Sequence, residues 1–90
     1  MYEIILSAEF KENFEKLPKH IKKKFLTKIK IFSNNPFHPI LHTEKLNPPF
    51  QNEYSFRIDV NYRVIFAFIG ERKILFITCG HHNWIYKFPR

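Results

Sequence analysis

The sequence predicts an α+β fold: an N-terminal strand, a helical hairpin, then an antiparallel three-strand meander, all in one curved sheet. Apolar spacing is strand-like up to residue 6, helix-like to about residue 32, and strand-like again from residue 54. The length of 90 residues suits one core, so we expect a single domain over residues 1–90. Eleven Phe and four Tyr can fill that core, because each buried aromatic removes roughly 150–250 Å² from water.

The first strand and first helix meet at Ser7. Residues 2–6 are β-branched and aromatic, which favours a strand. Ser7 can cap a helix that begins directly after it, and Glu9 suits the positive end of that helix. Apolar residues then follow at helical spacing, at Phe10, Phe14 and Leu17.

A second helix is expected after Pro18, which ends the first helix and fits the first turn of the next. Its apolar stripe is Ile21, Phe25, Ile29 and Phe32. Most of its lysines fall outside that stripe, and Asn34-Asn35-Pro36 ends it. Residues 37–53 are rich in Pro and His without periodicity, so we expect an irregular loop.

Three strand-like runs follow, at residues 54–59, 62–69 and 73–79. Three-residue loops at 59–61 and 70–72 would give one almost wholly apolar face, directed at the helices. The opposite face would then hold Arg57 directly across from Arg63, with Ser55, Asp59 and Cys79 nearby. A two-residue first loop would instead place Arg57 opposite Val64, because one step of register reverses every side chain.

The charge and cysteine content narrow the class of protein. The net charge is +7, and eight lysines against two glutamates lie between residues 11 and 30. Such an excess favours an anionic partner, either a nucleic acid or an acidic protein, although a solvated helix face is the alternative. One cysteine excludes an internal disulfide and fits a cytoplasmic location. We expect no signal peptide and no membrane span.

The predicted arginine pair and the histidines after the last strand are the candidate functional groups. Two arginines opposite each other repel, so either an anion binds there or Asp59 or Glu53 neutralises them. Arginine is the side chain best suited to gripping phosphate. A histidine after the last strand can transfer protons near neutral pH. Zinc ligation by the nearby cysteine and histidines is disfavoured, because adjacent histidines diverge and no second cysteine is present.

Taken in order, six short motifs resemble the RelE/ParE toxin superfamily over essentially the whole chain. They are Leu17-Pro18, Asn35-Pro36, Glu44-Lys45-Leu46, Tyr54-Ser55-Phe56-Arg57-Ile58, Asn61-Tyr62-Arg63-Val64-Ile65-Phe66, and Gly80-His81-His82 with Tyr86. The resemblance implies a RelE-like fold and a toxin of a type II toxin–antitoxin system. It further implies an mRNA interferase, a metal-independent endoribonuclease that acts in the cytoplasm, often at the ribosome, with no cofactor.

The resemblance also implies roles for individual residues. Arg63 and Arg57 would stabilise the phosphorane formed when the RNA 2′-hydroxyl attacks the adjacent phosphate. His82 would be the general acid, and Tyr86 would stack on or orient the substrate. Glu44 would be the general base, as in YoeB-like members.

Substrate contacts are expected from four further residues, namely Lys45, His81, Lys22 and Lys23. The expected partners are a cognate antitoxin protein, mRNA and the ribosome. The general base stays open, because Ser55 stands where some RelE members have lysine and Asn61 where YafQ-like members have aspartate.

Two alternatives to the nuclease remain. One is a ParE-like inhibitor of DNA gyrase without nuclease activity. The other is a catalytically degenerate relative that only binds its partner or nucleic acid. The combined presence of Arg57, Arg63, His82 and Tyr86 favours the nuclease, since a pure inhibitor would not require such a set.

Overall fold

A five-stranded sheet in the order β1-β5-β4-β3-β2 forms the centre of the computed structural model, which describes residues 1–87. β1 runs parallel to β5, and the other neighbouring strands are antiparallel. The strands are β1 Glu3–Leu6, β2 Glu44–Lys45, β3 Tyr54–Arg57, β4 Tyr62–Gly70 and β5 Lys73–His81. The predicted α+β fold and order of elements are confirmed. Sequence reasoning missed β2, which has only two residues.

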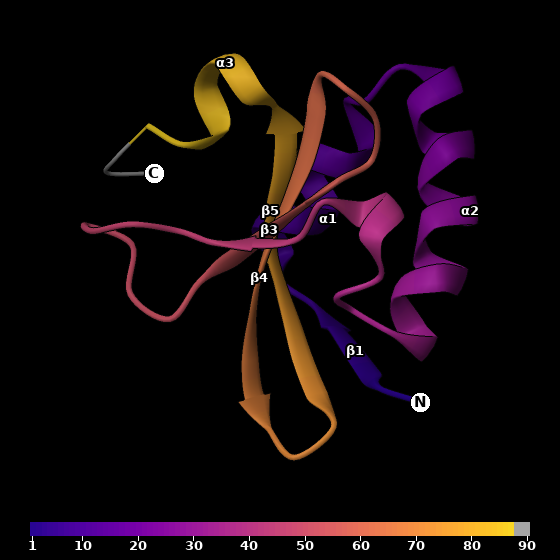
Figure 1. Cartoon of the computed structure of the whole chain (residues 1–90). Coiled ribbons are helices and arrows are strands. Elements are labelled where there is room, and N and C mark those ends of the chain that lie inside the picture. The colour runs from indigo at the N-terminus through magenta and orange to yellow at the C-terminus, as the bar shows by residue number, and fades with distance from the viewer. Residues whose placement is uncertain (88–90) are drawn as a thin grey trace.

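Helices α1 (Ala8–Glu15) and α2 (Lys19–Asn34) lie on one side of the sheet (Figure 1). The predicted cap is confirmed, since Ser7 Oγ accepts a hydrogen bond from Phe10 N at 2.9 Å. The same hydroxyl donates to the carbonyl of Ile77 at 2.7 Å, which ties the start of α1 to β5. Pro18 immediately precedes α2, and α2 ends before Asn35 as expected.

The core lies between these helices and the sheet and consists largely of aromatic rings. Phe10 of α1 and Phe32 of α2 meet the ring of Phe76 on β5, with centroid separations of 5.4 and 5.3 Å. Phe56 and Phe66 extend the cluster across β3 and β4. The apolar face expected on the meander is therefore the one that the helices cover.

The register of the first hairpin is as predicted. Arg57 pairs with Arg63, and the amide of Ile58 donates to the carbonyl of Tyr62 at 2.9 Å, so the loop has three residues. The second hairpin differs, because Gly70 pairs with Lys73 and only residues 71 and 72 form the loop. Arg72 there adopts a left-handed φ of 58°.

Cys79 was predicted on the arginine face, and this was wrong. A register shift after Ile65 brings Cys79 opposite Val64, because an extra residue in one strand reverses the alternation beyond it. The thiol lies in the helix-side core, with Sγ 3.9 Å from the carbonyl oxygen of Phe10. Burial raises the pKa of Cys79 to about 12.

The opposite side of the sheet is partly covered by two segments, one from the expected irregular loop at residues 37–53 and one that follows β5. A short helix, α3 (His82–Ile85), follows β5 and buries Ile85. Helix α3 extends away from α2, and so does the loop that follows β2 (Figure 1). The 37–53 segment also contains a 3₁₀ turn at Pro39–Leu41. Within residues 1–87, no helix has the length and apolar character needed to cross a membrane.

Candidate active site

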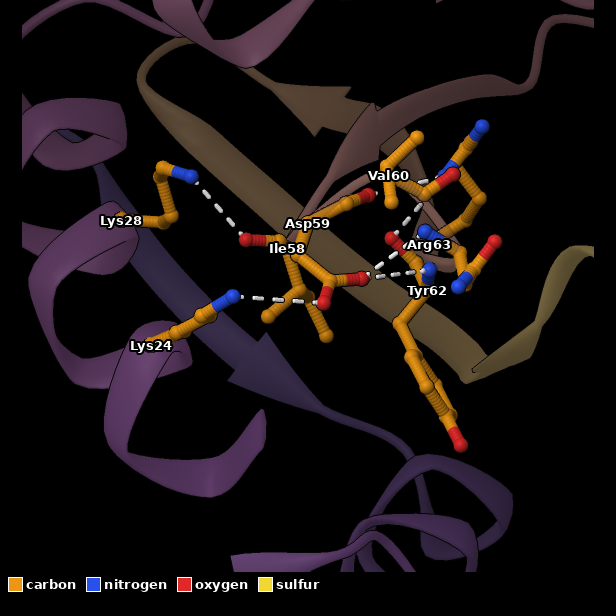
Figure 2. Close-up of polar contacts among 8 residues, drawn as sticks. Lys24, Lys28, Ile58, Asp59, Val60, Tyr62 and Arg63 are labelled. Atoms are coloured by element: carbon orange, nitrogen blue, oxygen red, sulfur yellow. Dashed lines mark hydrogen bonds and ion pairs between the residues drawn. The ribbon is translucent and has the colours of Figure 1, made fainter. Parts of the chain in front are cut away.

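The arginine pair on β3 and β4 has no carboxylate partner within residues 1–87. Arg63 Nη1 donates to the carbonyls of Asp59 and Val60, at 3.0 and 2.9 Å, and to that of Tyr62 at 3.3 Å (Figure 2). These bonds hold Arg63 against the turn between β3 and β4. Nη2 and Nε take no part in them, which leaves these donors for an anion.

Asp59 does not neutralise the arginine pair, contrary to one alternative from the sequence. Its Oδ1 accepts from the backbone amides of Asn61 and Tyr62, at 2.9 and 3.0 Å, and its Oδ2 lies 3.5 Å from Lys24 Nζ (Figure 2). Burial alone would raise the pKa of this carboxyl. The two amides and Lys24 outweigh burial, so the pKa of Asp59 is lowered from its ordinary value.

This lowered pKa makes the turn sensitive to acid. The ionised carboxylate contributes its full stabilisation of the fold above the ordinary pKa of 3.8. This stabilisation is lost as the pH falls through the lower pKa that Asp59 has in the folded protein. We expect Asp59→Asn to reduce the free energy of unfolding at pH 7 by about 1–2 kcal/mol. Urea unfolding at pH 7 and pH 3 should show that the difference in unfolding free energy between variant and wild type is smaller at pH 3. Glu71→Gln, at an exposed position, is the control. An equal difference in unfolding free energy for Asp59→Asn at both pH values would contradict a stabilising role of the ionised Asp59 carboxylate.

Tyr86 and Glu44 lie together on the side of the sheet away from α2. Both line a cavity of about 230 Å³, here called the Tyr86 cavity, and the Tyr86 hydroxyl donates to Ser55 Oγ at 3.1 Å. Ser55 pairs with Glu44 across β2 and β3 and lies two residues before Arg57 on the same strand. The other lining residues are Leu46, Asn47, Pro48 and Phe50.

The two histidines at the start of α3 have different environments. His81 caps α3, because its Nδ1 accepts from the amide of Asn83 at 3.0 Å, and its ring meets Tyr62 edge-on at 5.2 Å. His82 is exposed and stacks on His81 with centroids 4.7 Å apart. The amide of His82 donates to the carbonyl of Asn61 at 2.8 Å, so this histidine is anchored to the turn that Arg63 contacts.

The position of α3 depends on Gly80, which pairs with Arg63. A methyl group at position 80 would lie 2.0 Å from Cζ2 of Trp84. The indole therefore occupies the space that any other side chain would need. This close packing fixes the segment that carries His82 and Tyr86.

The structure brings only some of the predicted site residues together. Glu44 and Tyr86 share one cavity, whereas Arg57 lines a second cavity with Lys28 and His42. Arg63 and His82 lie at the turn between β3 and β4, where the backbone of His82 bonds to Asn61. The predicted residues thus form a band from the Tyr86 cavity to that turn rather than a single enclosed pocket.

The lysines expected to contact substrate lie elsewhere. Lys45 pairs with Tyr54, whose ring stacks on Phe66, so alternation directs Lys45 to the helix side. Lys22 lies on α2, over the ring of Phe14 and 3.8 Å from Glu15. Lys23 is exposed on the same helix. All three are thus separated from the Tyr86 cavity by the sheet or by its edge.

Sequence reasoning missed Ser55 as the partner of Tyr86, and Lys28 and His42 as neighbours of Arg57. No local pattern could have found them, because each contact joins segments that are distant in the chain. In the part of the chain that is described, no three His, Cys, Asp or Glu residues are grouped as metal ligands.

A family model described as the ParE toxin of the type II toxin–antitoxin system parDE matches residues 4–86. The chain belongs to this ParE toxin family. The match includes every strand and helix except the first residue of β1. No curated protein matched the sequence.

Solved structures similar to this ParE-family chain are also toxins. The YoeB/ParE toxin from Agrobacterium tumefaciens is 18% identical, with a TM-score of 0.75 over 89% of this chain and 98% of that one. YafQ from E. coli strain BL21(DE3) is 13% identical, with a TM-score of 0.79 over 97% and 100%. The RelB–RelE antitoxin–toxin complex from Methanococcus jannaschii contains a chain 22% identical, with a TM-score of 0.74 over 96% and 99%. At these identities the likeness establishes the RelE-like fold.

Proposed function

We propose that this ParE-family chain is a toxin that cleaves mRNA in the cytoplasm, at the ribosome, and is held inactive by a cognate antitoxin. Membership of a type II toxin–antitoxin family supports the antitoxin partner. Two similar structures, RelB–RelE from Methanococcus jannaschii and YoeB–YefM from Staphylococcus aureus, are of toxin with antitoxin. The positive charge of the chain suits an RNA substrate.

The observation that carries the nuclease proposal is the grouping of complementary chemistry on one side of the sheet. A carboxylate, Glu44, and a phenol, Tyr86, line the same cavity although they are far apart in sequence. The phenol is anchored on Ser55, one same-face step along β3 from Arg57. Arg57 in turn faces Arg63 across the strands, and no carboxylate of residues 1–87 forms an ion pair with either arginine.

The proposed reaction is an attack of the RNA 2′-hydroxyl on the adjacent phosphorus. Glu44 accepts the proton of the 2′-hydroxyl, because it is the carboxylate that lines the Tyr86 cavity. The Arg57 and Arg63 guanidinium groups stabilise the charge that builds up on the phosphorane oxygens. The bond to the 5′-oxygen then breaks, and His82 donates a proton to that oxygen.

The products are a 2′,3′-cyclic phosphate on one fragment and a 5′-hydroxyl on the other. The proton taken by Glu44 and the proton given by His82 balance, so no further reactant is consumed. Tyr86 presents an aromatic ring on which a base next to the cut can stack. His81 contributes indirectly, since it caps the helix that carries His82.

The test is to add purified protein to a translation extract and to map the new RNA ends. We expect cleavage of ribosome-associated mRNA, with a 2′,3′-cyclic or 3′-phosphate and a 5′-hydroxyl at each cut. A 5′-phosphate at the cut would contradict attack by the 2′-hydroxyl. Intact mRNA under these conditions would contradict the nuclease proposal itself.

Inhibition of DNA gyrase without RNA cleavage is the second candidate, favoured by the match to a family model described as ParE. A supercoiling assay with purified gyrase discriminates the two. Blocked supercoiling together with intact mRNA would replace the nuclease proposal with the gyrase one. Intact mRNA together with normal supercoiling would support a degenerate binding protein.

A further inference from the structure

We propose that a cavity beside the β3–β4 turn binds a backbone phosphate of the RNA strand, outside the linkage that is cut. This cavity, here called the turn cavity, has a volume of about 280 Å³. Its lining residues are Lys28, Ile40, His42, Arg57, Asp59 and Val60. The inference rests on the proposed RNA-cleaving function and adds a second contact to the same substrate.

The charge around the turn cavity is strongly positive. Four cations surround the turn, namely Lys24, Lys28, Arg57 and Arg63. Figure 2 shows Lys24 and Lys28 on one side of the turn and Arg63 on the other. Among the described residues that line the turn cavity, the one carboxylate is that of Asp59, whose oxygens are engaged by two backbone amides and by Lys24. Neither Lys28 nor Arg57 therefore has a counter-ion among residues 1–87, and an anion is the ligand that this arrangement favours.

The cations that line the cavity retain free donors. Lys28 Nζ donates one hydrogen bond, to the carbonyl of Ile58 at 3.0 Å, and an ammonium has three donors. Arg57 forms no side-chain hydrogen bond or ion pair with the described residues. His42, which has a left-handed φ of 49° at the end of the 3₁₀ turn, lines the same cavity. A phosphate presents enough acceptor oxygens to satisfy donors from all three.

Continuity with the arginine pair favours RNA over a separate small anion. Arg57 faces Arg63 across the sheet and also lines the turn cavity. A strand whose reacting phosphate lies at the arginine pair would therefore carry a neighbouring phosphate past the turn cavity. Ile40 and Val60 are exposed at its wall, where the apolar parts of a ribose or base can contact them.

The test compares Lys28→Gln with Lys30→Gln, which removes the same charge from an exposed position on α2 outside the cavity. The probe is a fluorescein-labelled 2′-O-methyl oligoribonucleotide, which lacks the attacking hydroxyl and stays intact. Binding is followed by anisotropy over a range of salt concentrations. We expect Lys28→Gln to reduce the slope of log K against log[salt] by about 0.7, as for one lost phosphate contact on a single strand. Lys30→Gln should leave the slope unchanged, and Lys28→Arg should restore it.

A second variant keeps the inference testable if Lys28→Gln weakens the fold through Ile58. His42→Asn retains a residue that tolerates the left-handed backbone and removes the imidazole, with an expected loss of affinity of about 3-fold. Normal slope and affinity in both variants would overturn the inference, even if wild-type protein cleaves mRNA. Binding of a polyglutamate peptide is measured in the same way. If Lys28→Gln weakens binding of this peptide but not of the RNA probe, the cavity would be assigned to an acidic protein segment instead. Wild-type protein that neither binds nor cleaves RNA would remove the proposed function first.

Discussion

Replacement of His82 by alanine is expected to slow RNA cleavage by roughly 10²- to 10⁴-fold, the range of a lost general acid. The side chain is exposed, and His81 is the one ring of residues 1–87 on which it stacks, so the variant should fold normally. Single-turnover cleavage with excess enzyme measures the chemical step. The matched control is His20→Ala, at an exposed position on α2, for which we expect the wild-type rate.

The role of His82 as an acid can be separated from a role in binding. A substrate in which sulfur replaces the 5′-oxygen at the cut has a leaving group that needs no proton. His82→Ala should therefore cleave this substrate at close to the wild-type rate. An equal defect on both substrates would show that His82 acts in binding or positioning, and a normal rate on the oxygen substrate would remove it from the mechanism.

Truncation of Phe76 to alanine is expected to cost about 3–5 kcal/mol of unfolding free energy, the range for a fully buried phenylalanine. Phe76 is fully buried on β5, and its ring contacts rings from both long helices and from β3 and β4. No neighbouring element can fill the space alone, because each is held by its own ring contacts. In a domain near the lower end of typical stability, about 5 kcal/mol, this loss would bring the variant close to unfolding.

Urea denaturation monitored by circular dichroism measures this loss. Leu26→Ala is the control, because Leu26 on α2 is 59% exposed and its truncation removes little buried surface. We expect its midpoint to stay near that of the wild type. A similar small change for Phe76→Ala would show that the core can collapse around the missing ring, contrary to the tightly connected cluster described above.

The proposed reaction uses some groups that are held by hydrogen bonds and one that is exposed. Arg63 and His81 are held by bonds to the turn and to α3, while His82 is exposed. Anchored groups lose little conformational freedom when substrate binds, and this favours positioning. Arg57 lines the turn cavity and lies two residues along β3 from Ser55, the hydrogen-bond partner of Tyr86, so it connects the two proposed RNA contacts.

The Asp59 turn links stability to this arrangement. The backbone carbonyls of Asp59 itself and of Val60 accept hydrogen bonds from Arg63. Loss of the Asp59 carboxylate would therefore loosen both the turn and the guanidinium that it holds. Acid sensitivity of the turn and the position of Arg63 are two consequences of one local structure.

Local patterns in the sequence were sufficient for the helices, the Ser7 cap and the pairing of Arg57 with Arg63. Each depends on residues close in the chain, on apolar spacing or on the length of one loop. Periodicity also identified the apolar face of the meander, because alternation holds as long as no residue is inserted.

Only the tertiary structure decided the burial of Cys79, the strand β2 and the meeting of Glu44 with Tyr86. One extra residue in β5 reversed the direction of Cys79, and nothing in its neighbours marks that insertion. The pairing of β2 with β3 and the meeting of Glu44 with Tyr86 join segments that are apart in the chain. Both depend on the paths of the intervening loops. Short-range spacing carries no information about such paths, and for this reason the cavities became visible only in three dimensions.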